Sequence, residues 1–405
     1  MIDSASLLEC IGCQIPFDIT FHASRITFQI TPQPSSNIGT LLLIFALALV
    51  VAVLATPLVQ RVARRYSVLD APSARKIHSN PVPLLGGAAI YLAVILSLIL
   101  LGHIEYVQQT ASILIGATFM SMLGLWDDKW GMRPLVKLLG QIGAASILFF
   151  SGVSVQFLRN DWLNYAATVA WVVTITNALN LMDNMDGLAG GVAAVASVFF
   201  FLVATLTNQY LVAPLAAVLV GACLGFLSYN LRPGAIFMGD TGSLFLGFML
   251  AAVGIKLRFP ENYDIVTWMV PVLLLGVPLF DTTLVTLSRI RRGVPISRGG
   301  KDHFSHRLVS LGLTRREAVL VLYLVQGALG VAALVVMQAD VVEGYIVGIV
   351  MLAAALAIAY RLEKVDLSQT NPAPAGTPEP VRLSTRLFRR PGSGVRGQGS
   401  GIGKH

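Results

Sequence analysis

Residues 163–207 read LNYAATVAWVVTITNALNLMDNMDGLAGGVAAVASVFFFLVATLT, and this stretch decides the fold class. Two apolar segments, 163–179 and 188–207, enclose a short polar turn that contains Asp183 and Asp186. A transmembrane helix needs about 20 mostly apolar residues, and both segments are close to that length. Because backbone groups in lipid must be hydrogen-bonded within their own segment, the stretch predicts two membrane helices joined by a turn at one membrane face.

The same alternation of apolar segments and polar connections runs through most of the chain. Of its 405 residues, 55% are hydrophobic and only 12% are charged, whereas about 25% of residues are charged in soluble proteins. We therefore expect an all-α polytopic membrane protein with about eleven transmembrane helices. The expected spans are 39–59, 84–102, 110–126, 134–151, 163–179, 188–207, 211–229, 241–257, 265–288, 317–337 and 342–360.

The distribution of Lys and Arg predicts the orientation of these spans. If the connection 60–83 faces the cytoplasm, most of the 29 Lys and Arg residues lie on the cytoplasmic side, as the positive-inside rule requires. The N-terminus is then outside and the C-terminus cytoplasmic. The net charge of +8 is mainly a topology signal, and because no nucleic-acid-binding motif accompanies it, nucleic acid is not an expected partner.

Composition divides the chain into three parts. Residues 1–38 are polar to mixed and form an expected extracytoplasmic segment, and residues 39–364 form the transmembrane catalytic domain. Residues 365–405 are rich in Pro, Gly, Ser and Arg, which cannot bury a core, so we expect a disordered basic cytoplasmic tail. Its cations either contact anionic membrane lipids or are simply solvated. The three cysteines do not make a disulfide framework.

Acidic residues are scarce, yet they gather in the connections expected at the cytoplasmic face. Asp127 and Asp128 follow the span 110–126, and adjacent carboxylates repel unless a cation or basic group lies near them. Such a pair suits Mg²⁺, or supplies one ligand and one base; the alternative is that the acids only cap a helix end. Lys137 lies one to two turns into the next span, where a charge needs a partner.

The turn quoted above carries the densest set of polar groups. Asn177, Asn180 and Asp183 recur every third residue, which places them near one helix face. Asn184 and Gly187 tolerate a left-handed backbone, so we expect the helix to break there. The turn contains no Lys or Arg to neutralise its carboxylates, which favours a functional site over a capped turn.

Asp240 lies in a glycine-rich connection, directly before a predicted span. Glycines let backbone N–H groups approach a phosphate, and a helix N-terminus favours an anion. Asp240 is therefore a candidate ligand for a metal ion that bridges such a phosphate, with a plain helix N-cap as the alternative. Asn230, at the start of the same connection, is a candidate substrate-binding residue.

Two histidines, His303 and His306, lie among Arg and Lys residues in the connection after the ninth expected span. Zinc would require Cys or further His ligands, so this cluster suits a diphosphate better. Asp281 lies inside that ninth span, and an ionisable residue at such depth indicates a functional site. Lys76 and His78 offer phosphate contacts in the first cytoplasmic connection, although that segment alone is better explained as an ordinary positively charged loop.

These segments, in this order, resemble the polyprenyl-phosphate N-acetylhexosamine-1-phosphate transferases, a glycosyltransferase family 4-like group, over about residues 70–310. Each motif alone is weak, whereas the ordered set is specific. Two positions depart from the family pattern: Asn184 stands where members commonly have Gly, and Ser305 stands where the first of two consecutive histidines is usual. The matching motifs are Asp127-Asp128, Asn177-x-x-Asn180-x-x-Asp183-x-x-Asp186-Gly-Leu, Phe237-Met-Gly-Asp240-x-Gly-Ser and His303-x-x-His306-Arg-Leu.

The resemblance implies a Mg²⁺-dependent phosphotransferase, with Mn²⁺ as an alternative cation. It would move a sugar 1-phosphate, GlcNAc-1-phosphate above all, from a UDP-sugar to undecaprenyl phosphate and release UMP. The active site would face the cytoplasm from the bacterial inner membrane, and the product would start a cell-envelope polysaccharide such as O-antigen or teichoic acid. Membrane lipids are further partners, and a homodimer is compatible with the sequence.

The resemblance also implies catalytic roles for the acids. Asp240 would be the leading Mg²⁺ ligand, with Asp128 or Asp186 near the metal. Asp127 would deprotonate or orient the lipid phosphate. That phosphate would attack the UDP-sugar directly, or an aspartate would first carry the phosphosugar, and the sequence leaves both routes open.

Substrate binding would fall to polar side chains of the same connections. The nucleotide would be held, or the metal shell completed, by Asn177, Asn180 and Asp183. The diphosphate would be bound, and the transferred phosphoryl group stabilised, by His303, His306 and Arg307. Further candidates for substrate contacts are Lys76, His78, Lys137, Asn230 and Asp281.

Two alternatives stay open at this point. A phospho-N-acetylmuramoyl-pentapeptide transferase-type enzyme would share most of the motifs, although that branch looks less similar. A secondary transporter would place ionisable residues near the membrane midplane in broken helices of related halves. Here most acids lie at loop edges and no internal repeat is evident, which disfavours transport.

Overall fold

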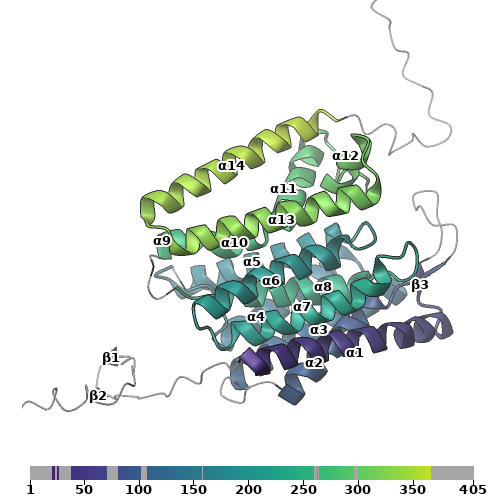
Figure 1. The fold of residues 1–405 in the computed structure, drawn as a ribbon, viewed down its shortest axis with the longest axis horizontal. Coiled ribbons are helices and arrows are strands. Elements are labelled where there is room, and N and C mark those ends of the chain that lie inside the picture. Colours follow the sequence, from purple (N-terminus) through teal and green to yellow (C-terminus); the bar gives the residue numbers. More distant parts are fainter. Residues whose placement is uncertain are drawn as a thin grey trace, which may run out of the picture.

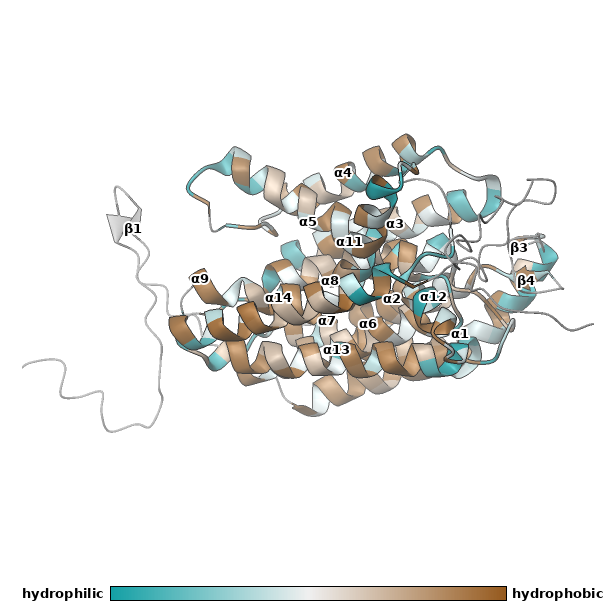
Figure 2. Ribbon diagram, turned by 90° about the horizontal axis from the view of Figure 1, so that it is seen from above, coloured by the Kyte–Doolittle hydropathy of each residue, from teal (hydrophilic) through white to brown (hydrophobic). Residues whose placement is uncertain are grey.

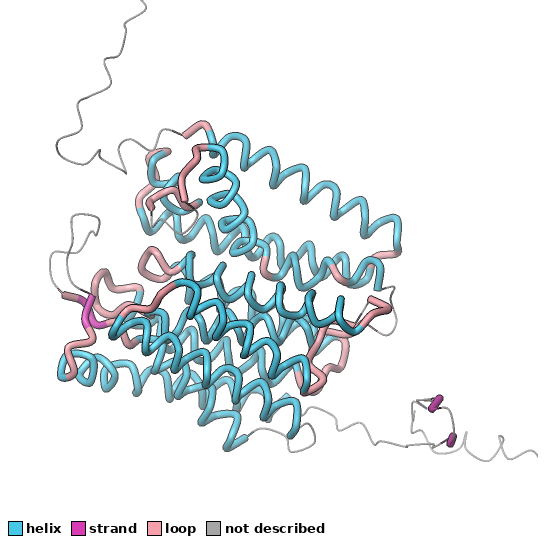
Figure 3. The backbone as a smooth tube through the Cα atoms, turned by 180° about the vertical axis from the view of Figure 1, so that it is seen from behind, coloured by secondary structure: helices cyan, strands magenta, loops and turns pink. Residues whose placement is uncertain are grey.

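The computed structural model describes residues 21–22, 25–26, 38–70, 81–101, 107–156, 158–259, 262, 264–295 and 300–365. Almost all of them are helical (Figure 3). The longer helices are α1 (Ile38–Arg65), α2 (Gly86–Leu101), α3 (Val107–Trp130), α4 (Pro134–Phe150), α5 (Asp161–Met182), α6 (Leu188–Leu206), α7 (Val212–Asn230), α8 (Gly239–Lys256), α11 (Gly276–Arg291), α13 (Arg315–Gln338) and α14 (Val341–Glu363). Shorter elements are α9 (Asp264–Thr267), α10 (Met269–Leu274), α12 (Phe304–Ser310) and the strands β1 (Phe21–His22), β2 (Arg25–Ile26), β3 (Leu69–Asp70) and β4 (Val82–Pro83).

Each segment expected to cross the membrane is mainly helical where the structure describes it. Seven of the described helices are long and apolar enough to span a membrane, or eight if a bent pair is counted as one span. Of the remaining long helices, α2, α4 and α8 have 16, 17 and 18 residues. The protein is thus an all-α polytopic membrane protein, as predicted. The expected terminal parts, 1–38 and 365–405, lie almost wholly outside the described residues, so their character stays a prediction.

The ninth expected span, 265–288, differs from the prediction because it is broken. Its two halves, Ile265–Leu274 and Gly276–Arg291, meet at 80°. The break frees backbone groups, and buried Gln326 of α13 bonds two of them: its amide nitrogen donates to Leu274 O at 2.9 Å, and its amide oxygen accepts from Val277 N at 3.3 Å. Broken helices are tolerated at membrane depth when a neighbour satisfies the backbone in this way.

The core of the bundle consists of α6, α7 and α8. α1 and α6 pack on α7, whereas α3 and α5 pack on α8. Gly221 and Gly225 let α7 approach α1 closely, because a Cβ on Gly221 would lie 2.3 Å from Phe45 O and one on Gly225 2.7 Å from Leu49 O. Small residues four apart are a common means of close packing between membrane helices.

The two outer sides of the molecule differ in packing. In Figure 1, α1 lies along one edge and α14 along the opposite edge, beyond α13. Only 6% of the most apolar 18-residue window of α14 is buried, against 83% for α7. α14 is fixed near its ends, where Gly344 packs against Val266 and the backbone of Leu362 accepts a hydrogen bond from Arg307. Its middle is left to face lipid or another protein.

Hydrophilic residues gather at helix ends, including α12 and the β3–β4 pair (Figure 2). The strands β3 and β4 pair antiparallel and flank residues 71–80. The chain after β4 is bonded to the segment before α8: Gly86 N donates to Phe237 O at 2.9 Å, and Gly87 N to Met238 O at 2.8 Å. This backbone pairing fixes the start of α8 and therefore the position of Asp240, which lies in its first turn.

Candidate active site

Lys137 is the point at which four helices meet through their polar side chains. Its Nζ lies 3.0 Å from Asp127 Oδ2 at the end of α3 and 3.1 Å from Asn180 Oδ1 near the end of α5. It also forms an ion pair with Asp240 Oδ2 in the first turn of α8. Lys137 itself lies in the first turns of α4. The cation that the acids require therefore comes from a different segment of the chain.

Asp240 is held by more than this ion pair. Asn180 Nδ2 donates to Asp240 Oδ1 at 2.8 Å and to Ser243 Oγ at 2.9 Å. Both carboxylate oxygens of Asp240 are thus bound, one by an amide and one by Lys137. Asn180 and Asp240 are both predicted site residues, and the fold brings them together. Ser243 appeared in the sequence only as the last residue of the Asp240 motif and was given no role there.

Asp128 caps α8 from α3. Its Oδ1 accepts from Asp240 N at 2.8 Å, and its Oδ2 accepts from Thr241 N at 2.9 Å and from Thr241 Oγ1 at 2.6 Å. The first N–H groups of a helix have no partner within the helix, and a carboxylate at that end also suits the helix dipole. The alternative that Asp240 is the N-cap is therefore wrong, because Asp128 does this from a distant segment. Asp128 positions Asp240 directly.

The turn between α5 and α6 follows the prediction in part. Gly187 adopts a left-handed conformation, with φ 80°, and its N–H donates to Asn230 Oδ1 at 2.8 Å. The helix does break here, because α5 ends at Met182, but Asn184 is not among the described residues with positive φ. The Nδ2 of Asn184 donates to Leu181 O at 3.1 Å, which bonds the turn to the last residues of α5.

Asp183 directly follows α5 and faces the other acids. It accepts a hydrogen bond from the backbone N–H of Gly239, which places it beside the start of α8. Burial, and then the carboxylates of Asp240, Asp128 and Asp186, raise the pKa of Asp183 to about 8. Five carboxylates from three connections therefore converge at one end of the bundle.

The histidine cluster is built on Asp281. Its Oδ2 lies 2.8 Å from His303 Nδ1, and its Oδ1 accepts from Phe304 N at 2.6 Å. The carboxylate in α11 thus fixes both the ring of His303 and the start of α12. Asp281 was expected to contact substrate; in the structure it is buried and acts on His303. Burial, and then His303 and Lys301, lower the pKa of His306 to about 4, so this imidazole is neutral near pH 7.

Arg307 has a structural task rather than the expected diphosphate contact. The side chain is 1% exposed, and its guanidinium donates to Asp302 O, to Leu362 O and to Ser288 Oγ at 2.9, 2.7 and 3.0 Å. These bonds join α12 to α11 and α14. A guanidinium with all three nitrogens engaged inside the protein is not presented to a ligand.

Asp302 anchors the same region through two arginines. Its carboxylate binds Arg289 and Arg292, each at 2.7 Å. Burial by itself would raise the pKa of Asp302, but the two guanidinium groups lower it to about 2. This acid was not singled out from the sequence, where it is only one charge in a basic loop.

Four candidate substrate-binding residues remain. Asn177 pairs with buried Gln141 of α4, donating to Gln141 Oε1 at 2.7 Å and accepting from Gln141 Nε2 at 3.1 Å. Asn230 is buried, and its Oδ1 accepts from Gly187 N while its Nδ2 donates to Ile236 O. Both amide side chains are therefore bonded to other parts of the protein and support the site. The other two candidates, Lys76 and His78, lie outside the described residues.

The donor chemistry of this site suits Mg²⁺. Carboxylate and amide oxygens are its preferred protein ligands, and Asp127, Asp240 and Asn180 present three such oxygens around one point. In the described part of the chain, no group of three His, Cys, Asp or Glu side chains is arranged to hold a metal ion. The charge at that point is balanced by Lys137. The residues therefore fit the ion by chemistry, with Lys137 sharing the same oxygens.

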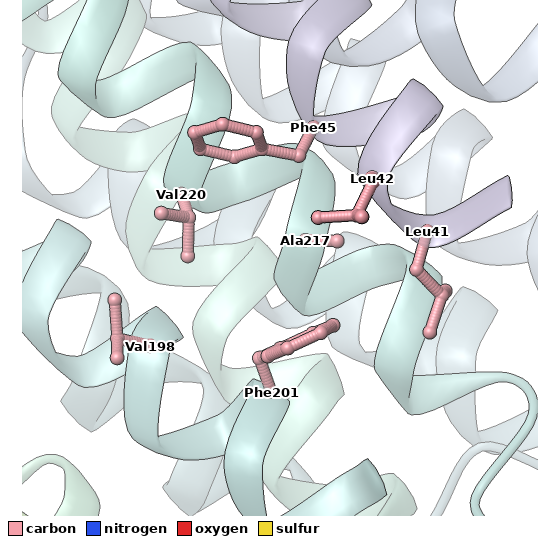
Figure 4. Close-up of a pocket in the computed structure, with 7 residues that line it drawn as sticks. All are labelled: Leu41, Leu42, Phe45, Val198, Phe201, Ala217 and Val220. Atoms are coloured by element: carbon pink, nitrogen blue, oxygen red, sulfur yellow. The ribbon is translucent and has the colours of Figure 1, made fainter. Parts of the chain in front are cut away.

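An apolar pocket lies elsewhere, among α1, α6 and α7 (Figure 4). Its volume is about 210 Å³. No polar side chain lines it, so it offers no acid, base or phosphate ligand and is separate from the chemistry described above. The lining residues are Leu41, Leu42, Phe45, Val198, Phe201, Ala217 and Val220.

The fold and the site together define a class of protein. It is a polytopic helical membrane protein with carboxylates, amides and a lysine gathered at one end of its bundle. A model of glycosyl transferase family 4 matches residues 110–258, which include Asp127, Asn180 and Asp240. A probable undecaprenyl-phosphate N-acetylglucosaminyl 1-phosphate transferase of Bacillus subtilis is 36% identical over 306 residues, which cover 73% of this chain and 85% of the relative. The chain therefore belongs to glycosyl transferase family 4.

Other relatives cover the two expected branches. The decaprenyl-phosphate N-acetylglucosaminephosphotransferase of Mycobacterium leprae is 30% identical over 352 residues, which cover 78% of this chain and 88% of the relative. A phospho-N-acetylmuramoyl-pentapeptide-transferase of Bacillus anthracis is 30% identical over 236 residues, which cover 53% of this chain and 73% of the relative. The similarity to the first branch extends over more of the chain.

Proposed function

We propose that this protein transfers a sugar 1-phosphate from a UDP-sugar to the phosphate of undecaprenyl phosphate and releases UMP. The observation that carries the proposal is the convergence of Asp127, Asn180 and Asp240 on Lys137. These residues come from four helices, and no structural need of a membrane bundle explains such a concentration of charge. Phosphoryl transfer is catalysed mainly by positioning and by electrostatic stabilisation of phosphate oxygens, which cations and hydrogen-bond donors at this site supply.

In this proposal Asp240 is the principal Mg²⁺ ligand, with Asp127 and Asn180 beside it. A bound Mg²⁺ would neutralise the diphosphate and polarise the phosphorus that is attacked. Asp128 positions Asp240 through the start of α8 and is not itself placed as a ligand. Asp186 stays a candidate for the metal shell. Lys137 is placed to contact a phosphate oxygen, because its ammonium already lies among oxygen ligands.

The atoms balance in a direct transfer. An oxygen of the lipid phosphate forms a bond to the phosphorus that bears the sugar, and the bond from that phosphorus to the oxygen bridging to UMP breaks. UMP leaves with that oxygen. Asp127 accepts from Met132 N at 2.7 Å and pairs with Lys137, which suits orienting the lipid phosphate better than removing a proton from it. His303, fixed by Asp281, and neutral His306 are proposed to bind the diphosphate.

We further propose GlcNAc as the sugar, because relatives whose names specify N-acetylglucosamine match 73% and 78% of this chain. The muramoyl-pentapeptide substrate is the second candidate, supported by the shorter match to that branch. The protein is also proposed to have eleven spans, with the N-terminus outside and the carboxylate site facing the cytoplasm of a bacterial inner membrane. A homodimer is a further possibility that the exposed side of α14 would permit.

The test uses purified protein with MgCl₂, undecaprenyl phosphate and a panel of UDP-sugars, with UMP release as the readout. Wild-type protein should release UMP with UDP-GlcNAc, and Asp240→Asn should lower the rate by about a hundredfold or more, as removal of a principal electrostatic group does. Asp161→Asn is the matched control, because this exposed aspartate lies at the opposite end of α5. Sugar movement across vesicles without UMP release would favour a transporter and overturn the proposal.

A further inference from the structure

The turn between α5 and α6 is bonded directly to α12. Ser305 Oγ donates to Asn184 Oδ1 at 2.9 Å, across 121 positions of sequence. Ser305 is only 1% exposed. The direction of the Asn184 amide is fixed from the other side, because its Nδ2 donates to Leu181 O at 3.1 Å. The amide oxygen is therefore turned toward α12.

The two ends of this bond carry different parts of the proposed site. Asn184 directly follows Asp183 and lies two positions before Asp186, whereas Ser305 lies between His303 and His306. The bond thus joins the carboxylate turn to the histidine cluster. The other hydrogen bonds of α12, from Arg307 and to Asp281, join it to α11 and to α14.

Packing alone does not determine this register. Met182, Met185 and Phe304 lie in one buried apolar cluster with residues of α11 and α13, so the turn and α12 also attract each other through apolar contact. That attraction has no preferred direction, and the bonds to Asp281 and from Arg307 fix α12 only relative to α11 and α14. A hydrogen bond between two buried or half-buried side chains has a defined length and angle, and it selects one arrangement.

Both partners are also the positions at which this chain departs from the family pattern, with Asn where Gly is common and Ser where His is common. An Asn184 amide without Ser305 loses its donor, and a Ser305 hydroxyl without Asn184 is buried without this acceptor. An unpaired buried polar group is costly. The two departures are therefore chemically complementary.

We propose that Asn184 and Ser305 are a coupled pair of positioning residues that hold the His303 and His306 rings in register with the carboxylate turn. The pair replaces the Gly and His of the family pattern as one unit. This inference rests on the proposed transferase function, in which both clusters act on the same diphosphate. It predicts that loss of either partner lowers kcat more than it changes KM for undecaprenyl phosphate.

The test is a double-mutant cycle with Asn184→Ala, Ser305→Ala and the double variant, read as kcat and KM for UMP release. Each single variant should lower kcat by about three- to tenfold, and the double variant should be no slower than the slower single, because the second change removes nothing further. Ser305→Thr keeps the hydroxyl and should retain more activity than Ser305→Ala. Ser310→Ala is the matched control, because Ser310 Oγ in the same helix has no hydrogen-bond partner among the described residues.

Three outcomes would overturn the inference. Effects of the two alanine changes that multiply in the double variant would mean that the residues act independently. Unchanged kcat per folded molecule with a lower melting temperature would mean that the bond is only structural. An Asn184→Gly/Ser305→His variant that is as slow as the product of its single variants would contradict replacement as a unit.

The inference and the proposed function fail in different ways. If wild-type protein releases no UMP with any UDP-sugar, the transferase proposal fails. The same cycle read from melting temperatures still decides whether the two side chains are coupled. If wild-type protein is active and the cycle is additive, only the coupled pair is lost.

Discussion

The interpretation of Lys137 changes once its neighbours in the structure are known. In the sequence it is a lone cation in an apolar segment and one of the lesser substrate-binding candidates. In the structure it binds Asp127, Asn180 and Asp240 together. A charge in a membrane helix is retained where it has a partner, and here it has three. The residue stabilises the site and, in the proposed function, also offers a cation to a phosphate.

Lys137→Met is expected to lower the melting temperature of the purified protein, because Asp127 and Asp240 then repel each other without a nearby cation. MgCl₂ should raise the melting temperature of this variant by more than it raises that of wild type, since the ion binds the oxygens that the ammonium left. Differential scanning fluorimetry in detergent measures both effects. Lys129→Met, at an exposed lysine at the end of α3, is the control. An equal or smaller Mg²⁺ response in Lys137→Met would contradict the shared-oxygen geometry.

His306 makes stability depend on pH in a defined window. Its pKa falls from 6.5 to about 4 on folding, so the unfolded chain takes up a proton first as the pH falls. The contribution of neutral His306 is complete well above pH 6.5 and is lost as the pH falls toward 4, by about 2.5 kcal/mol at pH 4.5. Asp302, with a pKa of about 2, loses its contribution only below that window.

The corresponding prediction is that His306→Gln flattens the decline in melting temperature between pH 6.5 and 4.5. Melting curves of wild type and variant at half-unit pH steps check it. Parallel curves for the two proteins would show that another group controls the acid limb.

Among the helices, the bend between α10 and α11 differs most from the sequence-based prediction. The prediction of one continuous span failed because hydropathy does not register a break in backbone bonding. Pro271, Gly276 and Pro278 lie around the bend, and proline removes a donor while glycine weakens a helix. The break turns α11 so that Asp281 reaches His303 and the start of α12.

Gln326→Leu should destabilise the bend. The change leaves Leu274 O and Val277 N without their partner in α13, at a cost of about 1–3 kcal/mol for each buried group. We expect a lower melting temperature and reduced UMP release, since Asp281 and His303 lose their support. Gln338→Leu, at the exposed last residue of α13, should behave like wild type. A wild-type melting temperature for Gln326→Leu would mean that the bend needs no support from α13.

At the scale of the whole molecule, the bundle sorts its chemistry to one end. α3 and α5 end at the carboxylate site, whereas α4, α6 and α8 begin there, as antiparallel packing of consecutive helices requires. If the connections between spans are numbered in chain order, the odd-numbered and the even-numbered connections must therefore lie at opposite ends of the bundle. The acids, amides and histidines of the motifs all fall in connections of the same parity, and this brings them together.

The proposed orientation can be tested by cysteine labelling in intact cells. In a background without the three native cysteines, Asp161→Cys should react with a membrane-impermeant maleimide from outside. Arg316→Cys should react only after permeabilisation, because it lies at the opposite end of the bundle, at the start of α13. Both positions are exposed. If only Arg316→Cys were labelled in intact cells, the orientation would be the reverse of the proposed one, and the site would not face the cytoplasm.

The sequence by itself determined the helical membrane fold, nearly all the helix positions and the candidate residues that meet at Lys137. Hydropathy and helix length are local properties, and scarce charges in an apolar chain stand out without any structure. It could not assign Asp128 to α8, Gln141 to Asn177 or Arg307 to the backbone of α14, because each of these pairs joins segments that are far apart in sequence.

Only the tertiary structure decided which polar side chains face the site and which support it. A hydrogen bond requires its partners within about 3 Å of each other, and that distance is set by how the helices pack. The identity of a residue shows that it needs a partner, whereas packing decides whether a substrate or another part of the protein meets that need.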